Sequence, residues 1–313
     1  MRAILSIVPD MAGIGEGACR SGRSRALRAT VISAMLLAIA SCTTGAVGAD
    51  SPDEVTVVAS FYPLAYAADQ VGDDAVTVTN LTPPGVEPHD LEVTSKDLEA
   101  IAGADVIVYL GGGFQPAVEE AVASEASGVI VDALEATPSA DPHLWLDPGS
   151  FANVVERVAA ALGEASSADA DAFAANADDL EARLAKLDDE FEQGLADCKI
   201  RVIITNHAAF GALAAAYDLE QRSISGLSPE SEPDPARIAE LAEEARAEGV
   251  TTIFTEDLVS SEVAETLAAE AGLETAVLSP LEGLTEEQTA AGDDYLSVMR
   301  RNLETLRDGL VCT

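Results

Sequence analysis

The sequence holds three histidines, and each lies in a loop-like segment where an imidazole can reach a ligand. His89 follows a stretch rich in proline and glycine, His143 lies within an Asp-Pro-His-Leu-Trp segment, and His207 directly follows a branched aliphatic run. Imidazole is the commonest metal ligand near neutral pH. A single loop histidine is more often solvated than ligating, and only the three together favour a metal. Their spacings, 54 residues from 89 to 143 and 64 residues from 143 to 207, match no local zinc motif.

Alternating β and α signals indicate the fold that must bring these side chains together. Short runs rich in valine and isoleucine predict strands, with helical segments such as 96–102 and 116–123 between them. The predicted strands are 55–60, 75–79, 105–110, 128–131, 200–205, 221–224, 250–254 and 274–278. This alternation predicts an α/β protein with two lobes, each with a mostly parallel four-stranded sheet. Ligands bind just beyond the carboxyl ends of such strands, and the positions of all three histidines suit such an edge.

A long helical segment without strand signals separates the two sets of strands. Its apolar residues recur every three or four positions and form one stripe on a helix of roughly 30 residues, or about 45 Å. The stripe consists of Phe173, Ala177, Leu180, Leu184, Leu187, Phe191 and Leu195. A coiled-coil dimerisation helix has the same period. Because the stripe is short and single, we expect a monomer with an N-terminal lobe at 54–165, a linking helix at 166–197 and a C-terminal lobe at 198–313.

The N-terminus has the layout of an export signal. Four arginines between positions 20 and 28 precede an apolar stretch, 29–40, that is too short to span a bilayer. The stretch runs into Ile39-Ala40-Ser41-Cys42, which resembles the bacterial lipobox. We therefore expect a signal peptide at 1–42, a lipidated Cys42, a flexible tether at 43–53 and an extracytoplasmic protein held at the membrane. The first ~19 residues do not fit a standard signal, which favours a later start codon.

Two of the four cysteines remain once the signal segment is set aside. Cys19 lies in or before the signal and Cys42 would be lipidated, which leaves Cys198 and Cys312. In an exported protein this pair favours a disulfide, and the alternative is two unlinked thiols. The charge balance of 55 acidic against 17 basic residues, a net charge of -38, makes nucleic acid and anionic lipids poor partners.

Several segments of the chain resemble one family, the metal-binding solute receptors of bacterial ABC transporters, in their zinc/manganese branch. The matching segments are 86–92, 141–148, 205–210, 226–230, 278–283, 292–296 and 299–303, in the family's order. The resemblance implies two α/β lobes joined by a rigid helix, with one metal in the cleft and an ABC permease as the partner. By motif position, His89 and His143 would come from the N-terminal lobe, and His207 and Glu282 from the C-terminal lobe.

The fourth ligand is the position at which this chain departs from many family members. They carry an aspartate near Ser279, and a serine cannot replace a carboxylate. Glu282 also follows the predicted strand 274–278, so the strand-end argument favours it independently. Glu256 and water are the alternatives. Asp90, Asp141 and Asp147 are candidates for orienting the imidazoles, although solvated loop carboxylates would look the same.

Three imidazoles and one carboxylate suit Zn²⁺ at tetrahedral geometry, whereas manganese prefers more oxygen ligands. We therefore expect a zinc receptor that is not an enzyme. The alternatives are a manganese receptor, a metal-dependent surface adhesin and a secreted zinc hydrolase. A hydrolase would keep one metal position open for water, and the sequence contains no His-Glu-x-x-His helix. The family's zinc members often carry a histidine-rich loop, which this chain lacks.

Overall fold

The computed structural model describes residues 54–137, 141–229, 231 and 234–313. The predicted signal peptide, Cys42 and the tether lie outside the described residues. The first lobe is built on a fully parallel sheet with strand order β2-β1-β3-β4. Its elements are β1 Val55–Ala59, α1 Tyr62–Gly72, β2 Val76–Asn80, α2 Ser95–Gly103, β3 Val106–Tyr109, α3 Pro116–Glu125, β4 Val129–Asp132 and α4 Pro148–Ala165.

The second lobe repeats this plan with a parallel sheet of order β6-β5-β7-β8. Its elements are β5 Val202–Thr205, α6 Gly211–Ala216, β6 Glu220–Ser223, α7 Pro235–Glu248, β7 Thr252–Thr255, α8 Glu262–Ala271, β8 Glu274–Val277, α9 Glu286–Ala291 and α10 Tyr295–Gly309. The fold class expected from the sequence is confirmed. Observed strand ends differ from the predicted ones by no more than two residues.

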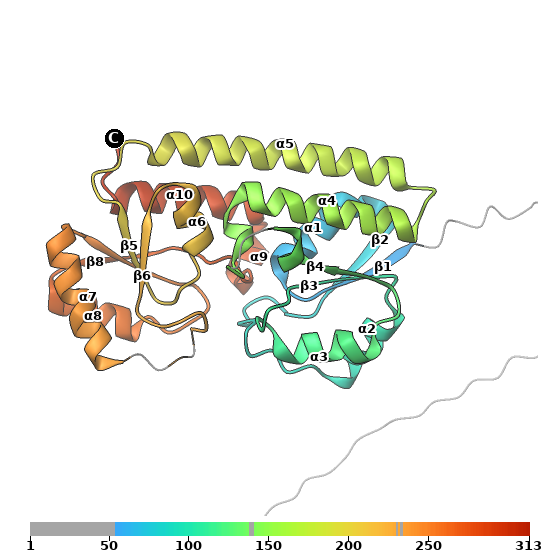
Figure 1. Ribbon diagram of the computed structural model, residues 1–313, viewed down its shortest axis with the longest axis horizontal. Helices are drawn as coiled ribbons and strands as arrows, with labels where there is room; N and C mark the ends of the chain where they lie inside the picture. Colours follow the sequence, from blue (N-terminus) through green and yellow to red (C-terminus); the bar gives the residue numbers. More distant parts are fainter. Residues whose placement is uncertain (1–53, 138–140, 230, 232–233) are drawn as a thin grey trace, which may run out of the picture. The chain divides into compact units, whose positions relative to one another are not determined.

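Helices cover both faces of the first sheet, which explains its nearly continuous apolar strands. In Figure 1, α2 and α3 lie on one face, while α1 and α4 lie on the other. Successive side chains of β1 alternate between these layers: Val57 belongs to the large core beneath α1 and α4, and Val58 to a smaller core beneath α2 and α3.

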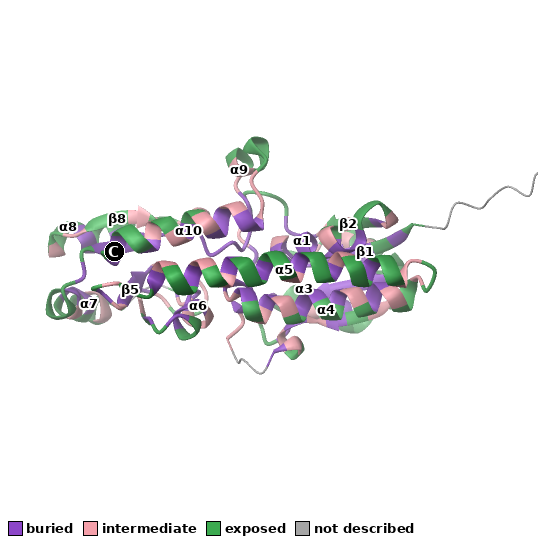
Figure 2. Ribbon diagram, turned by 90° about the horizontal axis from the view of Figure 1, so that it is seen from above, coloured by how far each residue is buried: buried purple, intermediate pink, exposed green. Residues whose placement is uncertain are grey.

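The two sheets are joined by α5, Ala170–Leu195, a helix of 26 residues. Every residue of the predicted apolar stripe is buried, from Phe173 to Leu195. Figure 2 shows α5 running between α4 on one side and α1 and α10 on the other, along both lobes. The stripe therefore packs within the chain, as the intramolecular interpretation predicts, and it joins the two lobes into one continuous core.

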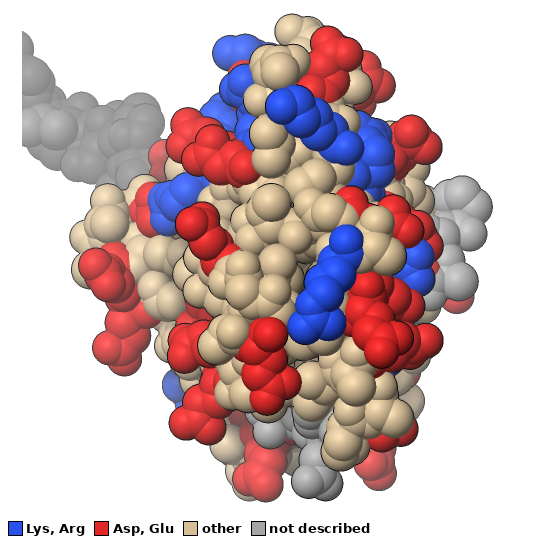
Figure 3. Space-filling model, turned by 90° about the vertical axis from the view of Figure 1, so that its left-hand side faces the viewer, with Lys and Arg blue, Asp and Glu red and all other residues tan. Residues whose placement is uncertain are grey.

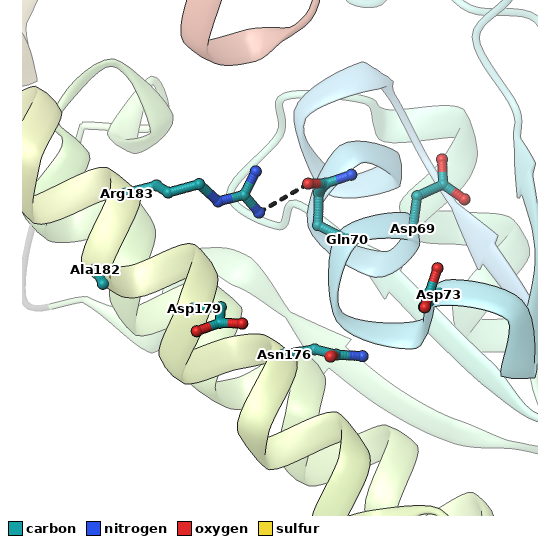
Figure 4. A pocket seen from close by; sticks show the side chains of 7 residues that line it. All are labelled: Asp69, Gln70, Asp73, Asn176, Asp179, Ala182 and Arg183. Carbon is teal, nitrogen blue, oxygen red and sulfur yellow. Dashed lines mark hydrogen bonds between the residues drawn. The ribbon is translucent and has the colours of Figure 1, made fainter.

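Polar contacts fix the N-terminal half of α5 against α1. Arg183 donates to the Gln70 side chain at 2.8 Å (Figure 4). Asn176 donates to the Val71 carbonyl at 2.9 Å. At the other end, Arg201 donates to the carbonyl of Leu195 at 2.6 Å, which satisfies a carbonyl that the helix leaves free.

The predicted disulfide between Cys198 and Cys312 is present. It closes a loop with a sequence separation of 114 residues and joins the segment after α5 to the C-terminus. The two cysteines also form an isolated antiparallel bridge, and Ile200 N donates to the Leu310 carbonyl at 3.1 Å beside them.

Removing this disulfide is expected to lower the free energy of unfolding by about 2–4 kcal/mol, because the unfolded chain regains the entropy of an open loop. Urea unfolding of the Cys198→Ala/Cys312→Ala variant measures the loss. Wild-type protein treated with reductant should match the variant, and the variant should not respond to reductant. Equal stability of oxidised wild type and variant would contradict this expectation.

Candidate metal centre

Four side chains from separate loops converge where the two lobes meet. The potential ligand atoms of His89, His143, His207 and Glu282 all lie within 4.8 Å of one another. Glu282 Oε1 is their common neighbour, at 3.3 Å from His89 Nε2 and 3.2 Å from both His143 Nε2 and His207 Nε2. The His89 side chain is 8% exposed and the other three are buried, so the cluster is almost closed to solvent.

The topology of the sheets explains the convergence. His207 comes two residues after β5, and Glu282 lies in the loop that follows β8. His89 lies in the loop after β2, and His143 lies beyond β4. Because parallel strands present their carboxyl ends at one edge of a sheet, each lobe brings its two side chains to the same edge. The two edges face each other, and the cluster forms between them.

His207 is oriented by Glu256, which follows β7 directly. One oxygen of Glu256 accepts from the backbone N–H of His207 at 3.0 Å, and the other lies 2.7 Å from Nδ1. The carboxylate favours a proton on Nδ1, so Nε2 is the ring nitrogen that faces the cluster and would bind a metal after losing its own proton. Burial alone would lower the pKa of His207, but Glu256 and Glu282 together raise it to about 10.

His143 is oriented in the same way by Asp141. The Asp141 carboxylate accepts from the backbone N–H of His143 at 2.9 Å and lies 3.2 Å from Nδ1. Burial opposes a charge on His143, yet Asp141 and Glu282 raise its pKa. The buried Nε2 has no hydrogen bond of good geometry among the described residues, although Glu282 Oε1 is only 3.2 Å away. This nitrogen is thus available to a ligand at the centre of the cluster.

His89 is held by its own loop and by an aromatic ring. Its backbone N–H donates to Glu87 at 3.0 Å, and Gln115 donates to the Pro88 carbonyl at 3.1 Å. The ring of Phe114 packs on the imidazole with 4.2 Å between centroids. Burial raises the pKa of Glu87. The carboxylate of Glu87 therefore lies close to the cluster, next to His89, which is the most accessible of the three histidines.

Glu282 lies in a tightly held loop. Leu281, the residue before it, has a φ of +53°, a conformation that a non-glycine residue keeps only where its surroundings impose it. The side chain of Asn302 in α10 binds Ser279 twice, accepting from its N–H at 2.9 Å and donating to its carbonyl at 2.7 Å. Burial alone would raise the pKa of Glu282, but the three imidazoles hold it well below the usual range.

The donor set fits a tetrahedral metal. Bonds of about 2.0–2.1 Å to a tetrahedral zinc place neighbouring ligand atoms about 3.3–3.4 Å apart. The three distances of 3.2–3.3 Å from Glu282 Oε1 agree with this spacing, and all four ligand atoms lie within 4.8 Å of one another, so the imidazoles would move closer together around a bound zinc. Three nitrogens and one oxygen, with carboxylates behind two of the imidazoles, are also the ligand chemistry that Zn²⁺ prefers.

The structure separates the candidates that the sequence left open. Glu282 lies in the cluster, whereas Glu256 is bonded to Nδ1 of His207, the ring nitrogen other than the one that faces the cluster. Of the three aspartates, Asp141 does contact an imidazole. The idea that Asp147 orients one is wrong, because it caps α4 by accepting from the N–H groups of Gly149 and Ser150. Asp90 is exposed.

Two neighbours of His89, Glu87 and Phe114, were not assigned these roles from sequence. Glu87 lies two residues before the histidine and accepts from its backbone N–H. Phe114 follows β3 by five residues, so the strand-end argument that applies to the histidines applies to it as well.

Fold and site together define a class: a two-lobed α/β protein with a candidate metal centre enclosed between its lobes. The model of the family described as zinc-uptake complex component A, periplasmic (ZnuA), matches residues 57–309. This chain belongs to that family, which confirms the resemblance noted from sequence. Since the family consists of uptake components, the expectation that the chain is not an enzyme is confirmed at the family level.

Individual relatives agree with this assignment. The zinc-binding protein AdcA of Streptococcus pyogenes serotype M6 is 37% identical over 287 residues, which cover 81% of this chain and 56% of AdcA. The chain therefore spans about half the length of AdcA. The high-affinity zinc uptake system protein ZnuA of Bacillus subtilis is 34% identical over 307 residues, covering 90% of this chain and 96% of ZnuA.

Among solved structures, the Zn(II)-bound ZnuA-like domain of Streptococcus pneumoniae AdcA superposes with a TM-score of 0.72 at 36% identity. The match covers 82% of this chain and 99% of that domain. Within the part of the chain that the structure describes, no helix combines the length and apolar character needed to cross a bilayer. Acidic and basic side chains are mixed on the end face of the second lobe, without one broad basic patch (Figure 3).

Proposed function

We propose that this chain is the extracytoplasmic receptor of an ABC-type uptake system, that it captures Zn²⁺ between its lobes, and that it delivers the ion to a permease. The observation that carries the proposal is the convergence of three imidazole nitrogens on one carboxylate oxygen at 3.2–3.3 Å. The names of its relatives, a zinc-binding protein and a zinc uptake protein, support the choice of metal.

His89, His143, His207 and Glu282 would be the four ligands in this proposal. Each lobe contributes two of them, so bound zinc would hold the lobes together. The proposed boundaries remain those expected from sequence: an N-terminal lobe at 54–165, a linking helix at 166–197 and a C-terminal lobe at 198–313. Four protein ligands would leave no open position for water, which distinguishes a carrier from a zinc hydrolase.

The direct test is metal analysis followed by competition. Protein purified without added metal is expected to contain one zinc per chain or to take up one on titration. In calorimetry, an excess of Mn²⁺ should not displace the zinc, because six oxygen-rich positions are not available to manganese here. Displacement of zinc by equimolar manganese would instead support the manganese receptor, and no binding of either ion would refute the proposal.

We propose that Glu256 raises zinc affinity by orienting His207, and this role can be tested. Glu256→Gln keeps the size of the side chain but removes the charge behind Nδ1, so zinc affinity should fall about 10- to 100-fold. Asp257→Asn is the matched control, since it removes the same charge from the next residue, whose carboxylate accepts from Gln288 instead. Competition with a zinc chelator measures both variants. A loss of affinity equal in the two would show a general charge effect and contradict the role.

We further propose that the mature protein begins at Cys42 and is held at the membrane by a lipid on that residue. The small residues that lead into Cys42 and the basic, then apolar, segment before them support this proposal. In Cys42→Ala, the protein is expected to move from the membrane fraction to the soluble fraction or to remain unprocessed. Fractionation of cells expressing each form measures this, and unchanged membrane attachment of processed protein would contradict the anchor.

A further inference from the structure

Trp145, the single tryptophan of the chain, makes two hydrogen bonds to the opposite lobe. Its indole Nε1 donates to the Pro280 carbonyl at 2.8 Å. Its own carbonyl accepts from the Tyr295 hydroxyl at 2.6 Å. Trp145 and Tyr295 are fully buried. One residue of the first lobe is therefore joined to the second lobe from both its side chain and its backbone.

These bonds join the two segments that carry His143 and Glu282. Trp145 follows His143 by two residues, and Pro280 precedes Glu282 by two residues. The hydrogen bond from the indole to the Pro280 carbonyl therefore links His143 to Glu282 with only one residue between each of them and the bonded pair. The ligand atoms of this pair, His143 Nε2 and Glu282 Oε1, lie 3.2 Å apart, and among the described residues His143 Nε2 has no hydrogen bond of good geometry beside this ion pair.

The surroundings keep both partners rigid. Around the indole, Phe61 and Phe114 pack with ring centroids at 4.8 and 5.5 Å, which excludes water from the hydrogen bond. On the other side, Asn302 holds Ser279, and Leu281 keeps its positive φ. The loop of Glu282 is thus held between α10 and Trp145. Without the indole N–H, the Pro280 carbonyl would remain buried and unpaired.

We propose that Trp145 is a positioning residue for the metal site, which holds His143 at ligand distance from Glu282 before the metal binds. His143, His207 and Glu282 then form a preassembled set of three donors. Preorganised donors bind more tightly because the ordering of the ligands is not left to the binding step. This inference rests on the proposed function, since it assigns Trp145 a role at the same metal site.

The test compares Trp145→Phe with wild type. Phenylalanine keeps an aromatic ring in the core and removes only the indole N–H and part of the ring system. Zinc affinity, measured against a chelator, is expected to fall about 10-fold or more. The visible spectrum of the Co²⁺-loaded protein should change as well, because the coordination geometry depends on where His143 lies. A purely structural role would leave this spectrum unchanged.

Tyr217→Phe is the matched control. It also removes one hydrogen bond, from the Tyr217 hydroxyl to Asp188 at 2.8 Å, but this bond is partly buried and lies at the contact between the second lobe and α5. It should reduce stability without changing zinc affinity or the Co²⁺ spectrum. If Trp145→Phe does not fold, Tyr295→Phe provides the second variant, and a smaller loss of zinc affinity is expected because the indole bond remains.

Because Trp145 is the single tryptophan, its fluorescence reports directly on the preassembled state. Metal-free wild type should show the blue-shifted emission of a buried indole, and zinc should not move the maximum. A red-shifted emission without metal would overturn preassembly. Wild-type affinity and Co²⁺ spectrum in Trp145→Phe would overturn the positioning role alone. Failure of wild type to bind zinc, or full binding by His143→Ala, would overturn the proposed function itself.

Discussion

His207→Ala is expected to weaken zinc binding by about 100- to 1000-fold. A structural zinc site of four ligands contributes roughly 10–16 kcal/mol, or roughly 2.5–4 kcal/mol per ligand if shared equally. The loss at His207 should lie toward the upper end, because Glu256 and Glu282 would each lose one hydrogen bond to the imidazole and would face a cavity. Competition with chelators of graded affinity covers this range.

Two further variants make the result specific. Asp147→Ala removes the N-cap of α4 and should cost about 1 kcal/mol of stability without weakening zinc binding. Glu282→Ala should have an intermediate effect on affinity, since water can occupy the vacated position. If Glu256→Ala weakens zinc binding more than Glu282→Ala, the proposed fourth ligand is wrong. Wild-type affinity in His207→Ala would refute the histidine site.

Zinc affinity is expected to fall steeply on acidification, by more than about 10-fold per pH unit between pH 8 and pH 6. The pKa of His207 is raised to about 10, so its imidazole holds a proton across this window in metal-free protein, and the pKa of His143 is raised as well. Zinc needs neutral imidazoles and must displace the protons that they hold. Each displaced proton contributes a factor of 10 per pH unit, so His207 and His143 together give an expected slope above one.

The sign of the effect on stability follows from the same groups. A histidine whose pKa is higher in the folded than in the unfolded protein stabilises the metal-free fold. This stabilisation is complete below the pKa of the unfolded state, about 6.5, and is lost as the pH rises through the pKa of the folded state. Zinc-bound protein depends on the deprotonated imidazoles instead. The increase in melting temperature caused by zinc should therefore shrink as the pH falls from 8 to 6.

Calorimetry in two buffers with different ionisation enthalpies counts the protons released on zinc binding. More than one proton per zinc is expected at pH 7. Melting curves with and without zinc at each pH provide the independent check. An affinity that does not depend on pH would mean that the imidazoles do not bind the metal, and a slope below one would mean that His207 is already neutral in the metal-free protein.

Local patterns in the sequence were enough to predict most of the fold. The recurrence of apolar residues from Phe173 to Leu195 requires a helix with one buried face, because only a period near 3.6 brings them onto one side. Short runs of branched aliphatic residues predict buried parallel strands, because helices cover both faces of such a sheet and both faces of each strand must be apolar. The pairing of Cys198 with Cys312 followed from export and from the few cysteines available. The N-cap role of Asp147 was not predicted, although a proline follows it at the first helical position.

Tertiary structure decided which of these side chains meet. Glu256 and Glu282 both follow strands of one sheet, so sequence places both at the same edge but does not say which faces the imidazoles. Strand order decides the position of Glu256. Because β7 lies beside β5, Glu256 comes to Nδ1 of His207. Glu282 lies farther along its loop, and its direction depends on Leu281, Asn302 and Trp145, contacts that span up to 135 residues of sequence. Long-range contacts of this kind leave no periodic signal in the chain, because they exist only after both lobes have folded and packed against each other.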